Sequence, residues 1–156
     1  MNKTDEIKNT QEIIEGVLII SYKKLNKKLY FLLLKHKGGF WTFPGGAKDN
    51  EDNTIKDCAQ REIKEEIGLN IKKEDLIDTG IRNEFIYGLE KPIRAGKKGI
   101  TYIFVSKIME EKFSSFHNIE KVEWLTKNEV LEKLEFEDIK NLFNKAFDYI
   151  TKFSVF

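Results

Sequence analysis

One stretch, residues 54–68, constrains the fold most, because it has the pattern of a single amphipathic helix with two defined ends. Asn53 or Thr54 can serve as the N-cap, and Asp57 lies where a capping box places its acid when Thr54 is the cap. Gly68 ends the pattern as a C-terminal stop. The apolar positions repeat every four residues and predict a buried face: Ile55, Ala59 and Ile63.

Acidic residues gather in the last turns of this expected helix. Glu62 precedes Glu65 by three residues and Glu66 by four, so the three carboxylates project from neighbouring points. Arg61 lies four residues before Glu65 and is placed to hold its carboxylate. Hard divalent cations prefer such oxygen ligands, which indicates a metal-assisted reaction on phosphates. The alternative interpretation is a solvated helix face with ion pairs.

Residues 61–69 resemble the second half of the Nudix hydrolase signature, which reads Arg-Glu-apolar-any-Glu-Glu-any-Gly-apolar, and every position matches. Residues 41–46, which read Trp-Thr-Phe-Pro-Gly-Gly, resemble the loop before it. The resemblance covers about residues 13–150 and implies the α/β/α sandwich of that family.

The first half of the signature departs from the family pattern. The loop between Gly46 and Arg61 is one residue longer than expected. The glutamate that the family carries there is replaced by Asp52, Glu51 or Asn53, depending on where the gap is placed. In the family this residue supports the loop, so we expect a local adjustment.

The resemblance also assigns roles within the motif. It implies that Glu62, Glu65 and Glu66 bind the metal, together with the backbone carbonyl of Gly46 or its neighbour. It further implies that Arg61 orients a glutamate. Mg²⁺ is the expected cofactor, and the ligand set suits Mn²⁺ as well.

The general base is open between a glutamate of the motif helix, Glu65, and an acid on a later loop. Many relatives carry that acid six residues before a tryptophan that matches Trp124, where this chain has Asn118. Glu120 is the nearest upstream alternative. We expect His117 and His36 to face solvent.

Substrate choice depends on residues outside the motif. The pattern is similar to the branch that cleaves diadenosine tetraphosphate asymmetrically, although that branch usually has Lys-Gly in place of the Gly-Gly pair. The resemblance implies stacking of adenine on Tyr87 and phosphate contacts by Lys97 and Lys98. Arg82 and Lys35 are further candidate substrate contacts.

Three alternatives remain. The Gly-Gly loop is common in nucleoside triphosphate pyrophosphohydrolases, including those that remove oxidised nucleotides. Asp49 and Asp52 resemble aspartates of the coenzyme A diphosphatase branch, whose upstream segment is missing here. A catalytically silent Nudix domain that binds a nucleotide or a protein is the third, although such domains usually lose motif glutamates.

Composition indicates one compact domain. The chain has 156 residues and a net charge of +1, so no global field points to nucleic acid or to a membrane. The single cysteine, Cys58, lies on the apolar side of the motif helix and is expected to be a buried thiol. We expect a polar tail at residues 1–10, a domain at 11–156, a nucleotide partner, a cytoplasmic location without an export signal, and a monomer or homodimer.

The hydrophobic pattern predicts an α/β fold in which a mixed sheet lies between helices. Further helices are expected from about Thr126 to Leu134 and from Glu137 to Thr151, the first with a capping box. The expected strands cover residues 13–22, 29–35, 40–43, 77–87, 100–108 and 122–125.

Overall fold

The computed structural model describes residues 12–114 and 118–153. The predicted polar tail at residues 1–10 and the position of His117 lie outside the described residues. The predicted single domain from residue 11 onward stays a prediction.

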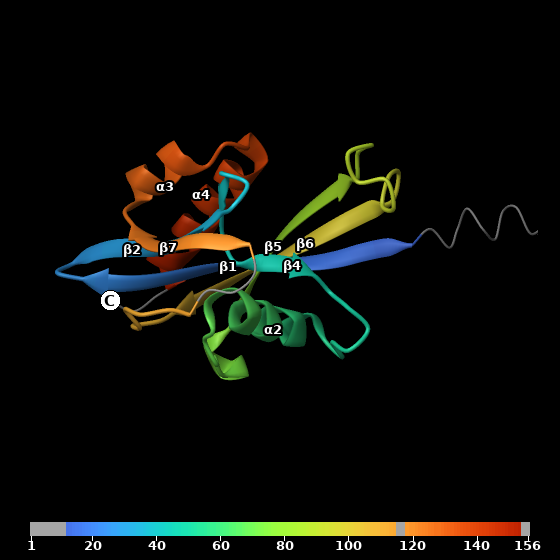
Figure 1. The fold of residues 1–156 in the computed structure, drawn as a ribbon. Helices are drawn as coiled ribbons and strands as arrows, with labels where there is room; N and C mark the ends of the chain where they lie inside the picture. The colour runs from blue at the N-terminus through green and yellow to red at the C-terminus, as the bar shows by residue number, and fades with distance from the viewer. Residues whose placement is uncertain (1–11, 115–117, 154–156) are drawn as a thin grey trace, which may run out of the picture.

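A seven-stranded mixed sheet forms the centre of the molecule, as predicted (Figure 1). Its main path runs β3-β2-β1-β6-β5, and β4 and β7 pair with β1 and β2. The β1 and β6 strands are parallel, and the other pairs are antiparallel. The strands are β1 (Ile13–Leu25), β2 (Lys28–His36), β3 (Trp41–Thr42), β4 (Gly45–Ala47), β5 (Ile77–Ile86), β6 (Lys98–Lys107) and β7 (Ile119–Leu125).

Helices cover both faces of this sheet, which confirms the predicted α/β/α sandwich (Figure 1). The motif helix α2 (Ile55–Ile67) lies on one face, and α3 (Lys127–Lys133) and α4 (Glu137–Phe153) lie on the other. A short 3₁₀ helix, η1 (Lys73–Asp75), follows α2. Among the described residues, no helix is both long enough and apolar enough to cross a membrane.

Each face of the sheet has its own hydrophobic core, because successive side chains of a strand point to opposite faces. Ile19 and Leu32 pack toward α2, together with the fully buried Cys58 and Ile63 of that helix. On the other side, Phe143 of α4 packs among side chains that include Ile20, Phe31 and Leu33. Two aromatic contacts extend this second core, since the Phe143 ring lies 5.0 Å from Phe31 and 5.5 Å from Phe43.

The caps of α2 form as the sequence predicts. Thr54 is the N-cap, with reciprocal hydrogen bonds to Asp57, and Gly68 adopts the left-handed conformation at φ 72°. Thr126 forms the second predicted capping box, at the start of α3.

The β4 strand was not predicted, because its three residues were assigned to the loop before α2. It pairs with β1 at Gly16, Val17 and Leu18. This pairing requires glycine: a Cβ atom on Gly16 would lie 2.9 Å from the carbonyl oxygen of Gly46. The loop before the motif helix is therefore anchored to the centre of the sheet.

Replacing Thr54 with Ala tests the contribution of the capping box. The substitution removes the acceptor for the Asp57 N–H and should lower the free energy of unfolding by about 1 kcal/mol, measured by urea denaturation. An unchanged midpoint would show that packing alone fixes the start of α2.

Candidate active site

Arg61 contacts several of the carboxylates that the motif brings together. Its Nη1 atom lies 3.1 Å from Glu62 Oε1 and 3.2 Å from Glu65 Oε2. Its Nη2 atom donates to the carbonyl of Ala47 at 3.1 Å, which ties α2 to β4. The guanidinium thus orients two candidate metal ligands and the loop beside them.

Asp52 is the strongest partner of Arg61. Arg61 donates from Nη2 to Asp52 Oδ2 at 2.8 Å and from Nε to Oδ1 at 3.0 Å, a bidentate geometry. The Asp52 side chain is 4% exposed, and the Arg61 hydrogen bonds lower its pKa below the ordinary value. Glu51 and Asn53 are exposed, so the longer loop places Asp52 against Arg61.

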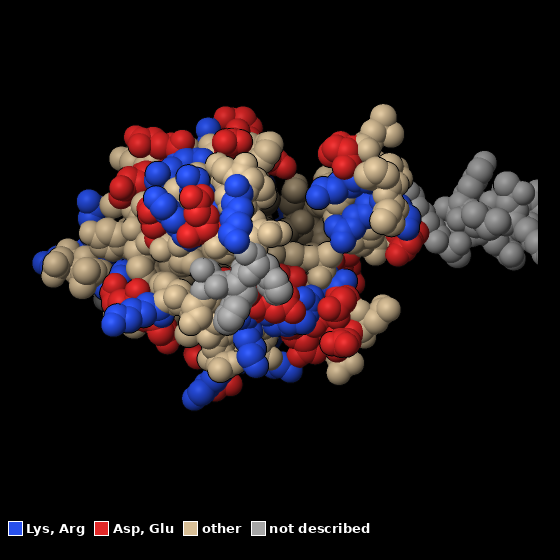
Figure 2. Space-filling model, in the orientation of Figure 1, with Lys and Arg blue, Asp and Glu red and all other residues tan. Residues whose placement is uncertain are grey.

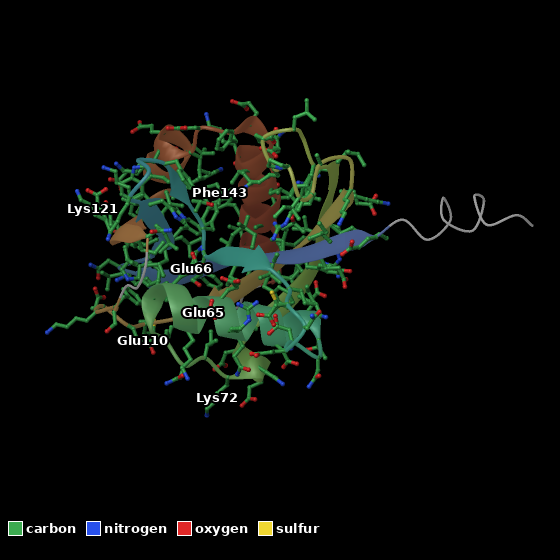
Figure 3. The ribbon with its side chains drawn as sticks, turned by 45° about the vertical axis from the view of Figure 1, so that its right-hand side comes forward. Glu65, Glu66, Lys72, Glu110, Lys121 and Phe143 are labelled. Atoms are coloured by element: carbon green, nitrogen blue, oxygen red, sulfur yellow. The ribbon has the colours of Figure 1, made fainter. Side chains whose placement is uncertain are left out.

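Glu62 and Glu66 lie side by side between α2 and β4. The backbone N–H of Gly45 donates to Glu66 Oε1 at 2.8 Å. Burial is the main cause that raises the pKa of both carboxyl groups, and the negative charge of Glu65 raises them further. Figure 3 shows Glu65 and Glu66 as neighbours on α2, with Glu66 nearer the sheet.

The donor chemistry of this cluster fits a hard divalent cation. Glu62 and Glu66 supply adjacent, partly buried carboxylates, and a Cβ atom on Gly46 would displace the Glu62 carboxylate from its position. Glu65 instead turns toward Arg61. Among the described residues, no three acidic, histidine or cysteine side chains converge as a complete metal site.

A cleft of about 430 Å³ opens beside Glu66. In Figure 2 it is the hollow between the helical side of the molecule and the β5–β6 hairpin. Its floor comes from β1, β4, β5 and β6, and its walls come from α4 and the loop after β5. The residues that supply its polar and charged lining are His36, Thr42, Glu66, Asn83, Tyr87, Lys91, Arg94 and Thr101.

Of the predicted substrate contacts at the β5–β6 hairpin, Tyr87 lines this cleft. Lys97 forms an ion pair with Glu12 at 2.8 Å, and Lys98 approaches Glu84 at 3.5 Å. Neither lysine is part of the cleft lining.

Arg82 is also turned away from the cleft. It pairs with Asp78 at 2.8 Å and lies over the Tyr102 ring at 4.3 Å. Its neighbour Asn83 lines the cleft instead, because adjacent strand residues point to opposite faces.

The predicted base Glu120 and the predicted contact Lys35 approach each other at 3.5 Å on β7 and β2. The Glu120 side chain is 46% exposed, and neither residue belongs to the cleft lining. The roles assigned to both stay predictions.

Sequence reasoning missed several cleft residues. His36, which we expected to face solvent, is partly buried; its ring stacks on Phe40 at 4.4 Å, and burial lowers its pKa. Lys91 and Arg94 line the cleft from the loop between β5 and β6, where the sequence analysis had named only lysines further along the chain as phosphate contacts. Arg94 lies 5.5 Å from the Tyr87 ring. The alternation of β5 is the signal that could have identified Asn83.

The comparison with known families decides the assignment. The NUDIX domain matches residues 15–145 of the chain. This chain belongs to the NUDIX hydrolase family. An 8-oxo-dGTP diphosphatase from Proteus vulgaris is 48% identical over 48 residues, which are 30% of this chain and 41% of that relative. The chain therefore matches less than half the length of this curated relative.

Solved NUDIX structures share the fold. A C. elegans Ap4A hydrolase binary complex superposes with a TM-score of 0.71 at 23% identity, covering 90% of this chain and 99% of that one. The NUDIX domain of Shewanella oneidensis NrtR, solved with ADP ribose, gives 0.73 at 14% identity, with 96% and 99% covered. At these identities the likeness establishes the fold of this NUDIX protein.

Replacing Asp52 with Asn tests the support of Arg61. The variant leaves a partly buried guanidinium without the charge of its strongest partner and should lose about 2 kcal/mol of unfolding free energy near pH 7. The lowered pKa of Asp52 means that its stabilisation is present above the unfolded value of 3.8 and is lost as pH falls through the folded pKa.

The measurement is the urea midpoint of both proteins between pH 7 and pH 3, with Asp75→Asn as an exposed control. The difference between wild type and Asp52→Asn should shrink at the acid end. A constant difference across this range would contradict the ion-pair explanation.

Proposed function

We propose that this NUDIX protein is a divalent-metal-dependent hydrolase that cleaves a phosphoanhydride bond in a nucleoside diphosphate linked to another group. The observation that carries the proposal is the cluster of Glu62 and Glu66 at the edge of a cleft that also presents Tyr87, Lys91 and Arg94. An acidic end suits a cation and its phosphates, and an aromatic and basic wall suits the rest of a nucleotide.

The proposed chemistry divides between the two ends of the cleft. Glu62, Glu66 and the Gly46 carbonyl would hold Mg²⁺ or Mn²⁺. A bound divalent ion neutralises phosphate charge and lowers the pKa of its water. Glu65 is the proposed base, since its carboxylate is half-exposed and its orientation is controlled by Arg61 at 3.2 Å.

The wall of the cleft would hold the nucleoside. Tyr87 offers a ring for stacking, and the Lys91 and Arg94 side chains would attract the polyphosphate. The volume of about 430 Å³ lies in the range of small-molecule sites. Diadenosine tetraphosphate is the proposed substrate on the resemblance of Tyr87 and its surroundings, and the cytoplasm is the proposed location.

A second candidate is a nucleoside triphosphate pyrophosphohydrolase. The Gly45–Gly46 pair and the local 48% identity to the Proteus vulgaris 8-oxo-dGTP diphosphatase favour it. Product identification separates the candidates: diadenosine tetraphosphate would give ATP and AMP, and a triphosphate would release pyrophosphate.

Metal binding should stabilise the folded protein without any substrate. Mg²⁺ at 100 times its dissociation constant should add about 2.7 kcal/mol, seen as a rise in Tm. Glu62→Gln and Glu66→Gln should reduce this rise, and a glutamine at position 66 keeps an oxygen that can accept the Gly45 N–H. The exposed control Glu74→Gln should respond like the wild type, and an equal rise in all variants would exclude the glutamates as ligands.

Glu65→Gln should remove turnover while leaving the fold intact. We expect a loss of at least about 100-fold in kcat, since the variant lacks the proposed anionic base. The measurement is Mg²⁺-dependent hydrolysis of diadenosine polyphosphates, nucleoside triphosphates including oxidised ones, ADP-ribose, nucleotide sugars and coenzyme A, with products identified by mass. An unchanged kcat would remove Glu65 from the chemistry.

A further inference from the structure

Four strands contribute one residue each to a row across the floor of the cleft. Asn83 on β5 is in register with Thr101 on β6, Thr101 with Gly16 on β1, and Gly16 with Ala47 on β4. All four line the cleft. The Ala47 end is joined to Arg61 through its carbonyl, so the row leads from the carboxylate cluster toward the sheet edge.

The far end of this row is polar and has hydrogen-bonding capacity to spare. The side chains of Asn83 and Thr101 make no hydrogen bond with another residue in the described part of the chain. The hydroxyl of Thr79 on β5, by contrast, donates to the Ile103 carbonyl on β6 at 2.6 Å. Asn83 and Thr101 are both partly buried and line the cleft, so their polar groups are available to a ligand there.

Apolar and aromatic groups flank this polar pair. Ile139 and Leu142 of α4 line the cleft beside it. Tyr87 lies four residues after Asn83, beyond the end of β5, and its ring contacts Phe85 edge-on at 4.8 Å. A ligand that fits here has flat apolar faces and a hydrogen-bonding edge, which is the chemistry of a nucleobase.

We propose that Asn83 and Thr101 bind the edge of the nucleobase and determine which base the cleft prefers. This rests on the proposed function, because a base at the sheet edge places the attached phosphates toward Glu66. The Asn83 amide offers two donors and an acceptor, and the Thr101 hydroxyl offers one donor and acceptor capacity. Together they can match a base edge on which a donor lies next to an acceptor.

The experiment measures binding of four nucleoside 5′-monophosphates, those of adenine, guanine, cytosine and uracil, to the full chain by calorimetry. Ribose 5-phosphate is the probe that lacks a base. Asn83→Leu removes both the donors and the acceptor of the side chain, and Asn83→Asp keeps its size and its acceptor but removes its donors. Glu84→Gln, on the opposite face of β5, is the matched control.

Asn83→Leu should weaken the best-bound monophosphate by about 10-fold to 100-fold, the range for two lost hydrogen bonds. Ribose 5-phosphate should bind as it does to the wild type, and Asn83→Asp should change the order of the four bases. For a hydrolysed nucleotide, KM should rise by the same factor with kcat unchanged.

Equal affinities and the same base order in wild type, Asn83→Leu and Asn83→Asp would overturn the proposal, as would a wild type that binds no monophosphate more tightly than ribose 5-phosphate. Neither result affects Mg²⁺-dependent turnover, which tests the proposed function separately. Base-selective binding that depends on Asn83, without turnover of any substrate, would support this inference and overturn the hydrolase proposal.

Discussion

The contact between Arg61 and Asp52 is the interaction on which the rest of the site depends. A guanidinium bound through both Nε and Nη2 by one buried carboxylate has a fixed position, and its remaining N–H groups then orient Glu62, Glu65 and the Ala47 carbonyl. The positive charge also offsets part of the repulsion among carboxylates that burial makes costly. A single side chain of α2 therefore positions both the carboxylates of the helix and the strand β4 beside it.

The sheet supplies the second constraint, because the loop before α2 pairs with its central strand. Gly16 and Gly46 allow β1 and β4 to approach closely, and this approach leaves room for the Glu62 carboxylate. The pairing of β4 with β1 therefore positions both the carboxylate cluster and the floor of the cleft. A side chain at Gly16 would push β4 away from β1, because its Cβ atom would lie 2.9 Å from the Gly46 carbonyl oxygen.

Local sequence signals were enough to predict the elements but not the cleft. The capping residues Thr54 and Gly68 and the apolar repeat of α2 act within a few residues, so both ends of the helix were predicted correctly. The cleft depends on long-range pairing: Asn83 meets Thr101, and β1 meets β6. Lys97 and Lys98 looked suitable by charge alone, yet their acidic neighbours Glu12 and Glu84 come close only in three dimensions.

The parallel pairing of β1 with β6 also affects how the molecule folds. Ile13 lies beside Lys98 in this ladder, so one of the longest chain closures in the domain joins the two strands that form the cleft floor. Contacts so distant in sequence form slowly, because the entropy of closing the loop is lost before they are made. The helix α2, with its local caps, can form early on the folding pathway. We therefore expect the carboxylates to be in place on a helix before the floor that they face has assembled.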